Sequence, residues 1–535
     1  MRTDTYFIWM RWKRLTSHDS KRSVRFALLV VLGVAIRPAS AQLTGAPTTS
    51  GPTRPQQVPL SGRTGATAGV TVQQQPVGGD NSVDTISTTV QVGGNYAGST
   101  PAADATGNSG RSLTIAEAIQ RGLLFNLGTK FAARSEQQAS LNQTETRSEL
   151  LPNISAQLSE NVNKINLATS GFDASAFPAI GQYFPSTVGP FHYYSAQANF
   201  SENVLDFTAY ANYGVAKRQT EAAKLSMADA REQVVLAVAA AYLRILSTIA
   251  TVQSEEAQVK DSQAVYDQSV AQEEAGAKAH VDVNRNLVQL QTERQRLAVD
   301  RVSVTKARMA LARMIGLSID EDYDVTDALS ADVAEVLPLS EAYNRALAGR
   351  QDLRAAEVQV RVAEQARRAA GAERLPTVKL QGFYGIQGVN PNSGTSVYNG
   401  SAQVNIPIFN GGQIRSDERL ADAALEQRKS ELADTREQVR FDVRSAWLDR
   451  DVAATQVGVA ESNRHLAAET LKQSGDRYFA GATTAVEVVQ SEQAVGAAER
   501  DYISALFSLN IAKINLARAM GEAEKDIPVV LKGAQ

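Results

Sequence analysis

Few residues of this 535-residue chain have the types and spacing that chemistry requires. The four histidines are His18, His192, His280 and His465. None lies four residues from another, the spacing that places two metal ligands on one helix face. The sequence has no cysteine, which excludes disulfides, thiolate zinc sites and cysteine nucleophiles. It also has no P-loop, G-x-S-x-G or H-E-x-x-H pattern. The sequence therefore predicts a protein that is not an enzyme and that binds no cofactor or metal.

The charged residues indicate solvated helix faces. Most acids stand among Arg and Lys in long polar segments, where pairing between residues four apart is typical. His280 could form a pH-sensitive contact, although a solvated surface histidine is the interpretation that we favour. The formal net charge is −3. A mildly acidic chain lacks the basic surface that nucleic acid binding requires, so we expect no nucleic acid partner.

The N-terminus has the features of a secretory signal peptide over residues 1–41. Basic residues precede an apolar run of eleven residues at 26–36, and Ala39-Ser40-Ala41 forms a small-residue cleavage site. A membrane anchor is excluded because a spanning helix needs about 20 apolar residues. We expect no later stretch to be apolar enough to span a membrane as a helix, so a spanning part would be a β-barrel.

Residues 42–110 are rich in Thr, Gly, Pro, Gln and Ser and show no sustained hydrophobic period. Such a segment buries too little apolar surface to offset the entropy lost on ordering. We therefore expect a disordered arm, with the folded part beginning near Leu113.

The folded part is a duplication. Leu113-Thr-Ile-Ala-Glu-Ala118 recurs as Leu337-Pro-Leu-Ser-Glu-Ala342, and Leu151-Pro152 recurs as Leu375-Pro376. Further matches, 205 or 206 residues apart, run to Leu516-Ala-Arg-Ala-Met-Gly521. Matches in one order with so few register shifts indicate two copies of one unit. We place the first repeat at residues 111–336, the second at 337–521, and a C-terminal tail at 522–535.

Each repeat contains one predicted β-hairpin, near residues 153–204 and 377–408. Apolar and polar residues alternate there with period two, which is typical of a strand with one apolar face. In the last strand Ala402, Val404 and Ile406 form the apolar face. Ser401, Gln403 and Asn405 form the polar face.

Long polar helices follow each hairpin, at residues 207–315 and 411–520. Each outgoing helix has about 68 residues without proline and would be roughly 100 Å long. Apolar residues recur every seven positions, which predicts coiled-coil packing. Gly276 and Gly481 mark the turns to the return helices, because glycine leaves the helical conformation at low cost.

Four amphipathic strands suggest two arrangements. They could form a soluble sheet packed on helices. Alternatively, several chains could pool their strands, because an open sheet edge is not tolerated in lipid. Three chains would supply about twelve strands, and the duplication would give walls with quasi-sixfold symmetry.

With these features the chain resembles the TolC-type outer-membrane efflux proteins over residues 113 to about 521. The resemblance rests on the Leu113-Thr-Ile-Ala-Glu-Ala118 start, both Leu-Pro pairs and the segment Ile406-Pro-Ile-Phe-Asn-Gly-Gly412. It rests further on Arg477-Tyr-Phe-Ala-Gly481 with Val486-Glu-Val488, and on the close Leu516-Ala-Arg-Ala-Met-Gly521. It implies a mostly α fold whose duplicated units, each with long coiled-coil helices and a β-hairpin, assemble as a homotrimer. The trimer would form a 12-strand outer-membrane β-barrel in lipid and a periplasmic α-helical barrel.

The resemblance also implies a function and sites. The protein would be a passive duct for efflux or type I secretion, reached from an inner-membrane pump through a periplasmic adaptor protein. The helix tips around Gly276, Gly481, Tyr478 and Thr483 would dock the adaptor. Asp282 and Glu487 match the carboxylates that constrict the pore in the family, with a solvated helix face as the alternative.

A different class of protein, a periplasmic adaptor, also uses helical hairpins. It would have one hairpin and no pairs of membrane strands, whereas this chain has both features twice.

Overall fold

The computed structural model describes residues 53–58, 70–79, 82–101, 111–167, 185, 187–276, 279–332, 337–390 and 392–530. All of them belong to one compact unit, Thr53–Gln535. The predicted signal peptide at 1–41 and most of the loop within the first hairpin lie outside the described residues.

The two repeats contain the same elements in the same order. The first repeat comprises α2 (Ile115–Phe125), α3 (Leu127–Ser148), β4 (Asn153–Asn166), β5 (Thr187–Leu205), α4 (Phe207–Glu274) and α5 (His280–Ile315). The second comprises α6 (Leu339–Gly349), α7 (Gln351–Ala372), β7 (Thr377–Gly388), β8 (Thr395–Asn405), α8 (Gln413–Phe479) and α9 (Ala485–Met520). The structure thus confirms a mostly helical fold with a smaller β part.

Local signals explain where the helices begin. Thr114 and Glu117 form a capping box at the start of α2, in which each side chain accepts a hydrogen bond from the other residue's backbone N–H. Asp206 caps α4, because its carboxylate accepts a hydrogen bond from the backbone N–H of Ala209 at 2.9 Å. The recurring motif at the start of the first repeat is therefore a helix-start signal.

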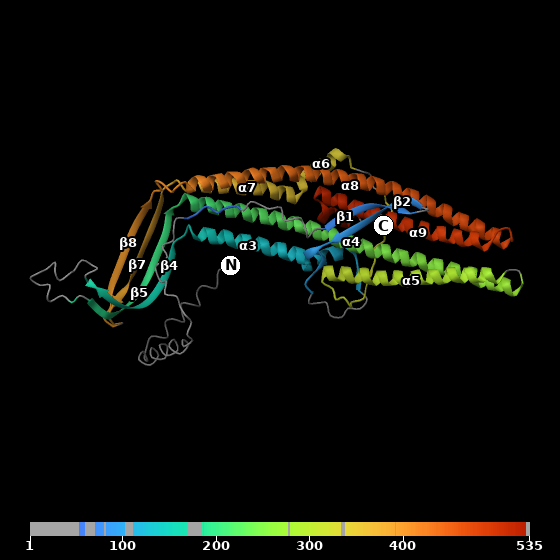
Figure 1. Cartoon of the computed structure of the whole chain (residues 1–535), viewed down its shortest axis with the longest axis horizontal. Coiled ribbons are helices and arrows are strands. Elements are labelled where there is room, and N and C mark those ends of the chain that lie inside the picture. The colour runs from blue at the N-terminus through green and yellow to red at the C-terminus, as the bar shows by residue number, and fades with distance from the viewer. Residues whose placement is uncertain are drawn as a thin grey trace, which may run out of the picture. The chain divides into compact units, whose positions relative to one another are not determined.

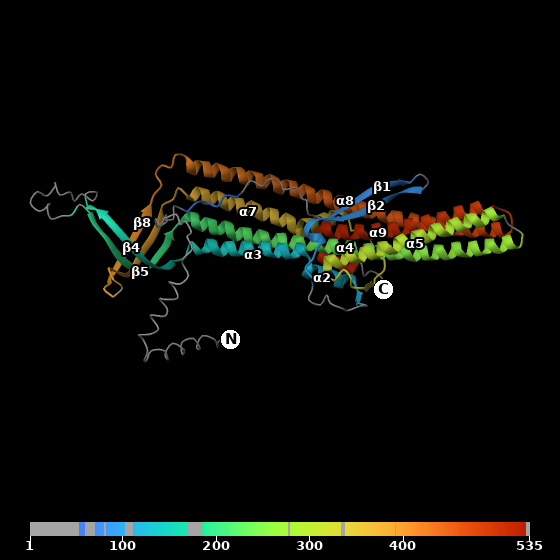
Figure 2. The same ribbon diagram turned by 60° about the horizontal axis from the view of Figure 1, so that its bottom comes forward.

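The four strands form one antiparallel sheet in the order β4-β5-β7-β8. The two hairpins of the duplication therefore meet through β5 and β7, while β4 and β8 each keep one edge that no described strand pairs. The long helices lead away from this sheet, and Figures 1 and 2 show the α4–α5 and α8–α9 turns at the opposite end of this unit.

The helices lie in rows that preserve the order of the sheet. Near the sheet, α4 packs against α3 and α7, and α7 packs against α8. Farther along, α4 packs against α5 and α9, and α9 packs against α8. The first repeat therefore presents β4, α3 and α5 on one flank, and the second presents β8 and α8 on the other.

The largest apolar core lies midway along the helices, where α2, α4, α5 and α9 meet. Tyr242 is fully buried there, and its hydroxyl lies 2.7 Å from Asp327 Oδ2 and 2.9 Å from the carbonyl oxygen of Leu113. The short strands β3 (Arg111–Leu113) and β6 (Tyr323–Val325) pair in parallel beside it. The tail contributes α10 (Ala523–Val530), whose Ile527 is fully buried in the same core.

The expectation of a disordered arm at residues 42–110 is wrong for the part that the structure describes. Residues in this range form β1 (Val70–Gly79), β2 (Ser82–Val92) and the short helix η1 (Gly94–Ala97). Valines of both strands pack against the core, and the buried hydroxyl of Thr88 lies 3.0 Å from that of Ser508 on α9. The core of the repeats supplies the apolar surface that the segment alone lacks.

A second correction concerns helical spans. Among the described residues, α4 contains one stretch that is long and apolar enough to cross a membrane, contrary to the expectation that none would. However, 72% of that stretch is buried inside the molecule. Its apolar residues belong to the core around Leu236 and Leu243, so protein packing accounts for the composition.

Candidate functional site

The sheet separates apolar from polar side chains. Across the strands, Leu158 pairs with Ala196, and Ala196 pairs with Ile386. Because paired residues share a face, this row belongs to an apolar face. The adjacent row contains Gln157 and Gln197 and belongs to the polar face. In β8, Val404 pairs with Val378 and Ser401 with Gln381, so the alternation predicted at residues 401–406 follows the two faces of the sheet.

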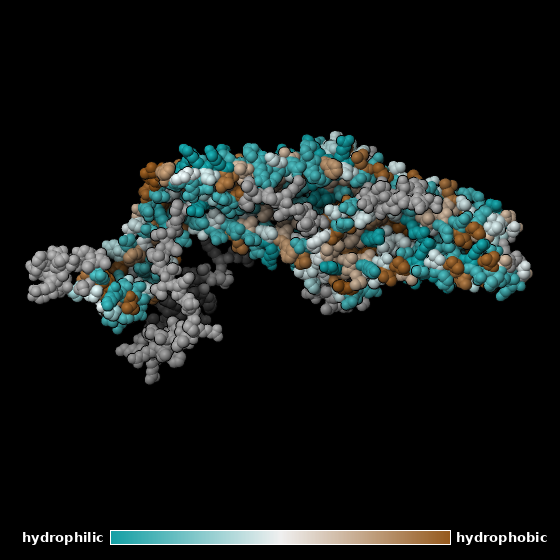
Figure 3. All heavy atoms as spheres, viewed as in Figure 1, coloured by the Kyte–Doolittle hydropathy of each residue, from teal (hydrophilic) through white to brown (hydrophobic). Residues whose placement is uncertain are grey.

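The apolar face of the sheet is exposed within one chain. Its exposed large residues are Ile154, Leu158, Val162, Tyr384, Ile386, Tyr398 and Val404. Leu158 is 74% exposed and Tyr398 is 81% exposed. A further apolar patch lies at the junction of β8 and α8, where Ile406, Ile408 and Phe409 are exposed (Figure 3). Exposed apolar surface of this kind marks contact with a membrane or a protein.

The two flanking helices also expose apolar side chains at coiled-coil spacing. On α5 they are Val281, Val288, Val299, Val302 and Met309. On α8 they are Phe441, Leu448, Val452, Val459 and Leu466. Several of these neighbours are seven residues apart, which is the repeat of a helix that packs against another helix. Figure 3 shows apolar patches among polar surface on the helical hairpins. The two stripes lie on opposite flanks, α5 and α8.

Gly276 and Gly481 form the turns at the ends of the two helical hairpins. Both have positive φ, 72° and 70°, which favours glycine. A Cβ added at either position would meet no atom within 4 Å. Glycine is therefore favoured here by backbone conformation, and among the described residues no neighbour crowds either position.

The carboxylate of Glu487 is held within its own hairpin. Arg477 Nη1 donates to Glu487 Oε1 at 2.8 Å, and the Thr483 hydroxyl donates to Glu487 Oε2. The structure therefore joins two residues singled out from the sequence, Thr483 and Glu487. The ion pair with Arg477 was missed, because the two residues are brought together only by the turn at Gly481.

Asp282 belongs to the first helical hairpin, α4–α5, but lies near Tyr478 of the second, α8–α9. Its own ion pair is with Arg285 at 3.4 Å. Tyr478 of α8 is 4% exposed and packs against Ala485 and Val488. Burial, and then the negative charge of Asp282, raise the pKa of Tyr478 above its usual value, while a hydrogen bond with Asn286 of α5 opposes the shift. Tyr478 thus connects the two tips.

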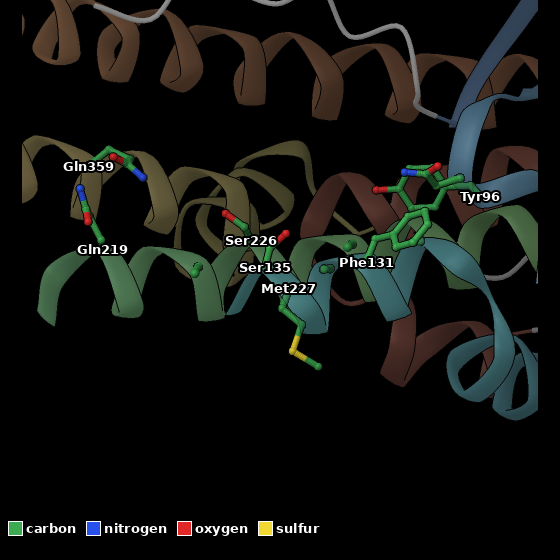
Figure 4. Close-up of a pocket in the computed structure, with 12 residues that line it drawn as sticks. Tyr96, Phe131, Ser135, Gln219, Ser226, Met227 and Gln359 are labelled. Atoms are coloured by element: carbon green, nitrogen blue, oxygen red, sulfur yellow. The ribbon is translucent and has the colours of Figure 1, made fainter. Parts of the chain in front are cut away.

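A cavity of about 440 Å³ lies between η1, α3, α4 and α7. Tyr96 and Phe131 lie at one end, and Gln219 and Gln359 at the other (Figure 4). None of the described residues that line it is charged. The described lining therefore offers hydroxyl and amide groups as its polar contacts.

Comparison with known proteins extends this picture. Residues 130–317 and 342–522 match the family described as outer membrane efflux protein. The probable outer membrane lipoprotein SilC of Salmonella typhimurium is 24% identical over 176 residues, which cover 32% of this chain and 38% of SilC. The pyoverdine export outer membrane protein OpmQ of Pseudomonas putida is 22% identical over 322 residues, which cover 57% of this chain and 65% of OpmQ. The chain thus aligns with less than two thirds of either relative.

Solved structures share the fold. The CmeC outer membrane channel of Campylobacter jejuni gives a TM-score of 0.65 at 15% identity, covering 78% of this chain and 88% of CmeC. The MtrE outer membrane channel of Neisseria gonorrhoeae gives 0.64 at 19% identity, covering 88% and 97%. Since the family match covers both repeats and more than half of the chain, this protein belongs to the outer membrane efflux protein family.

Proposed function

We propose that this protein is the outer-membrane channel of an export system, in which a homotrimer forms a passive duct from the periplasm to the exterior. The observation that carries the proposal is the four-stranded sheet, which has an exposed apolar face, a polar face and two unpaired edges. In a membrane, the apolar face would meet lipid and the polar face would line water. Unpaired edges cost several kcal/mol per backbone group in lipid, so the sheet must close.

Both the sheet and the long helices support closure of the sheet between copies of the chain. The unpaired edge of β4 lies on the first-repeat flank and that of β8 on the second, so head-to-tail contacts can continue the sheet. The apolar stripes of α5 and α8 lie on the same two flanks. A head-to-tail interface forms a ring when the rotation closes. Two copies would give eight strands, whose interior is filled by side chains, whereas three would give twelve around a lumen.

The helices would extend this lumen across the periplasm. Helix α4 has 68 residues, which corresponds to roughly 100 Å. The tips at Gly276 and Gly481, with Tyr478 and Thr483, would be the entrance and the docking surface for a periplasmic adaptor protein. The adaptor would connect the duct to an inner-membrane pump. Asp282 and Glu487 would be the constriction candidates near this entrance, each paired with an arginine of its own helical hairpin.

Membrane fractionation combined with an unheated gel tests the assembly. We expect a heat-sensitive oligomer in the outer-membrane fraction, with the mass of three chains by light scattering in detergent. A monodisperse monomer would refute the pooled-strand argument, because one sheet of four strands cannot close around a lumen.

Cysteine labelling tests the orientation of the sheet. The sequence lacks cysteine, so single cysteines at residues 401–406 report without background. We expect a water-soluble thiol reagent to label positions 401, 403 and 405 and to spare 402, 404 and 406. Uniform labelling would indicate a soluble segment, and the opposite alternation would place the polar face outward.

A further inference from the structure

The two helical hairpins meet along a polar seam, defined here as the contact of α4 and α5 with α9. Gln493 of α9 donates a hydrogen bond to Gln289 of α5 at 3.2 Å. Gly496 lies beside Gln258 of α4. On α4 the buried seam residues are Glu255, Gln258, Ser262 and Ser269. The hairpins are therefore held together here by polar side chains, unlike the apolar core nearer the middle of the helices.

Three carboxylates are buried in this seam, one from each helix. Glu255 of α4 is 1% exposed, Glu293 of α5 is 4% exposed and Glu492 of α9 is 4% exposed. Burying an ionised carboxylate is unfavourable unless it is paired and fully hydrogen bonded. The seam therefore stores an electrostatic cost that depends on protonation.

Two arginines neutralise part of this cluster. Arg500 Nη1 donates to Glu255 Oε1 at 2.7 Å, and Arg296 Nη1 donates to Glu293 Oε1 at 2.9 Å. The other oxygen of Glu255 is buried without a hydrogen-bond partner in the described structure. The described structure contains no ion pair for Glu492.

Further acidic side chains surround Glu492 on the neighbouring helices. Asp261 of α4 and Glu293 of α5 act on Glu492. Asp300 of α5 lies beside Glu255, Arg296 and Arg500. Helix α8 contributes Ser474, whose hydroxyl lies 2.7 Å from that of Ser491. The acids of the seam therefore outnumber its two arginines.

Burial, and then Asp261 and Glu293, raise the pKa of Glu492 to about 7. Burial also raises the pKa of Glu293, against the opposing charge of Arg296, and that of Asp300. These shifts agree with the geometry, because each follows from the loss of water around a crowded acid.

The duplication shows that the cluster is specific to this seam. At the repeat spacing of 205 residues, Glu255 corresponds to Ala460 and Glu293 to Ala498, while Glu492 corresponds to Leu287. The equivalent seam in a head-to-tail ring, between α8–α9 of one copy and α5 of the next, would thus be apolar at all three positions.

We propose that proton release from the buried cluster of Glu255, Glu293 and Glu492 loosens the seam between the two helical hairpins of each chain, so that the entrance parts more readily as the pH rises. Parting hydrates the carboxylates and removes the cost of their burial. The inference deepens the proposed duct function, since it assigns a regulation to the same entrance.

The direction and size of the pH effect on seam packing follow from the protonation of Glu492. Its pKa is about 7 when the seam is packed and 4.5 in water. Below 4.5 both states hold the proton, so this group has no effect. As the pH rises from 4.5 to 7 the packed state is progressively disfavoured, and above 7 the effect is constant. A shift of this size changes the ratio of parted to packed seams by up to about 300-fold.

A buried cysteine can report seam opening in the purified full chain. Ser262→Cys places a thiol on the seam side of α4, where Ser262 is 3% exposed. Ala264→Cys places an exposed thiol two residues away and corrects for the pH dependence of the reagent. We expect the labelling rate at 262, divided by that at 264, to rise steeply between pH 5 and pH 7.5 and then to level.

In the Ser262→Cys background, Glu492→Gln should make this rise in the labelling ratio at least tenfold smaller. The matched control is Glu499→Gln, seven residues farther along the same helix, whose carboxylate lies 3.9 Å from Arg464 of α8. It should keep the full rise. If Glu492→Gln does not assemble, Glu293→Gln serves as the second variant, with a smaller rise expected. A pH-independent ratio in the parent, or an unchanged rise in the variant, would overturn the proposal. Either result would leave the duct proposal intact, because labelling does not measure transport.

Discussion

An arginine at position 158 tests whether the apolar face of the sheet meets lipid. Leu158 lies on β4, is 74% exposed and shares its row with Ala196 and Ile386. Leu158→Arg would place a guanidinium in this apolar row. Gln157→Arg, one residue earlier, would place the same group beside Gln197 on the polar face. The two variants therefore differ in the face that carries the charge.

The expected cost follows from the surroundings of each position. An arginine on the lipid face of a membrane barrel costs about 2–4 kcal/mol at the midplane and little near the interfaces. On the same face, Glu160 stands two residues from Leu158 and could partly compensate the charge. We therefore expect a cost near the lower end, about 2 kcal/mol, or roughly a 30-fold loss of the assembled form relative to the unassembled one. We expect Gln157→Arg to cost less than about 0.5 kcal/mol.

Both variants can be measured by refolding the purified chain into lipid vesicles and titrating with urea, with the assembled oligomer scored on an unheated gel. We expect a lower transition midpoint for Leu158→Arg and an unchanged midpoint for Gln157→Arg. Equal midpoints would mean that the exposed apolar face does not contact lipid. A loss confined to Gln157→Arg would mean that the sheet is inverted.

Three further predictions concern the helical part. Tyr242→Phe removes a buried hydroxyl that contacts Asp327 and Leu113, and it should lower the free energy of unfolding by about 1–3 kcal/mol in urea titration. Tyr210→Phe, at an exposed tyrosine, should leave that free energy unchanged. Arg350→Gln removes a buried guanidinium that donates hydrogen bonds to Asp352 and Asp442, and it should lower the free energy of unfolding by about 3–5 kcal/mol. The exposed Arg440→Gln should lower it by less than about 1 kcal/mol, and equal losses would contradict the burial argument. Deletion of residues 70–92 should lower the thermal midpoint, because it uncovers the core that Val90 and Val92 contact, and an unchanged midpoint in calorimetry would show that the hairpin adds no stability.

The repeats were predictable from sequence because their boundaries depend on local chemistry. Pro152 and Pro376 stop helices, Thr114 and Glu117 form a capping box, and Gly276 and Gly481 adopt positive φ. Each signal acts within a few residues, so the pattern alone located the strands and long helices. The order β4-β5-β7-β8 depends instead on packing between repeats, which no local pattern encodes.

The ordered part of the N-terminal segment was missed for the opposite reason. Val70, Val72, Val90 and Val92 have the β-branched side chains that favour strands, but they stand among Thr, Gln and Gly. Composition over a long window therefore suggested disorder. The hairpin is ordered because its valines cover a core formed by helices far along the chain. The pairs Thr88–Ser508 and Arg477–Glu487 depend in the same way on the folded structure.

The duplication bears on how an entrance of this kind would open. If three copies close head to tail, six seams alternate around the helical barrel, three within chains and three between them. The seams within chains carry Glu255, Glu293 and Glu492, whereas the corresponding positions between chains are Ala460, Ala498 and Leu287. At these three positions the seams between chains carry no titrating group, so the pH-dependent cost of burying the carboxylates falls on the seams within chains. In each chain the helical hairpin α8–α9 would therefore part from α4–α5 of the same chain and stay packed on α5 of the neighbouring copy. The opened entrance would then have threefold and not sixfold symmetry.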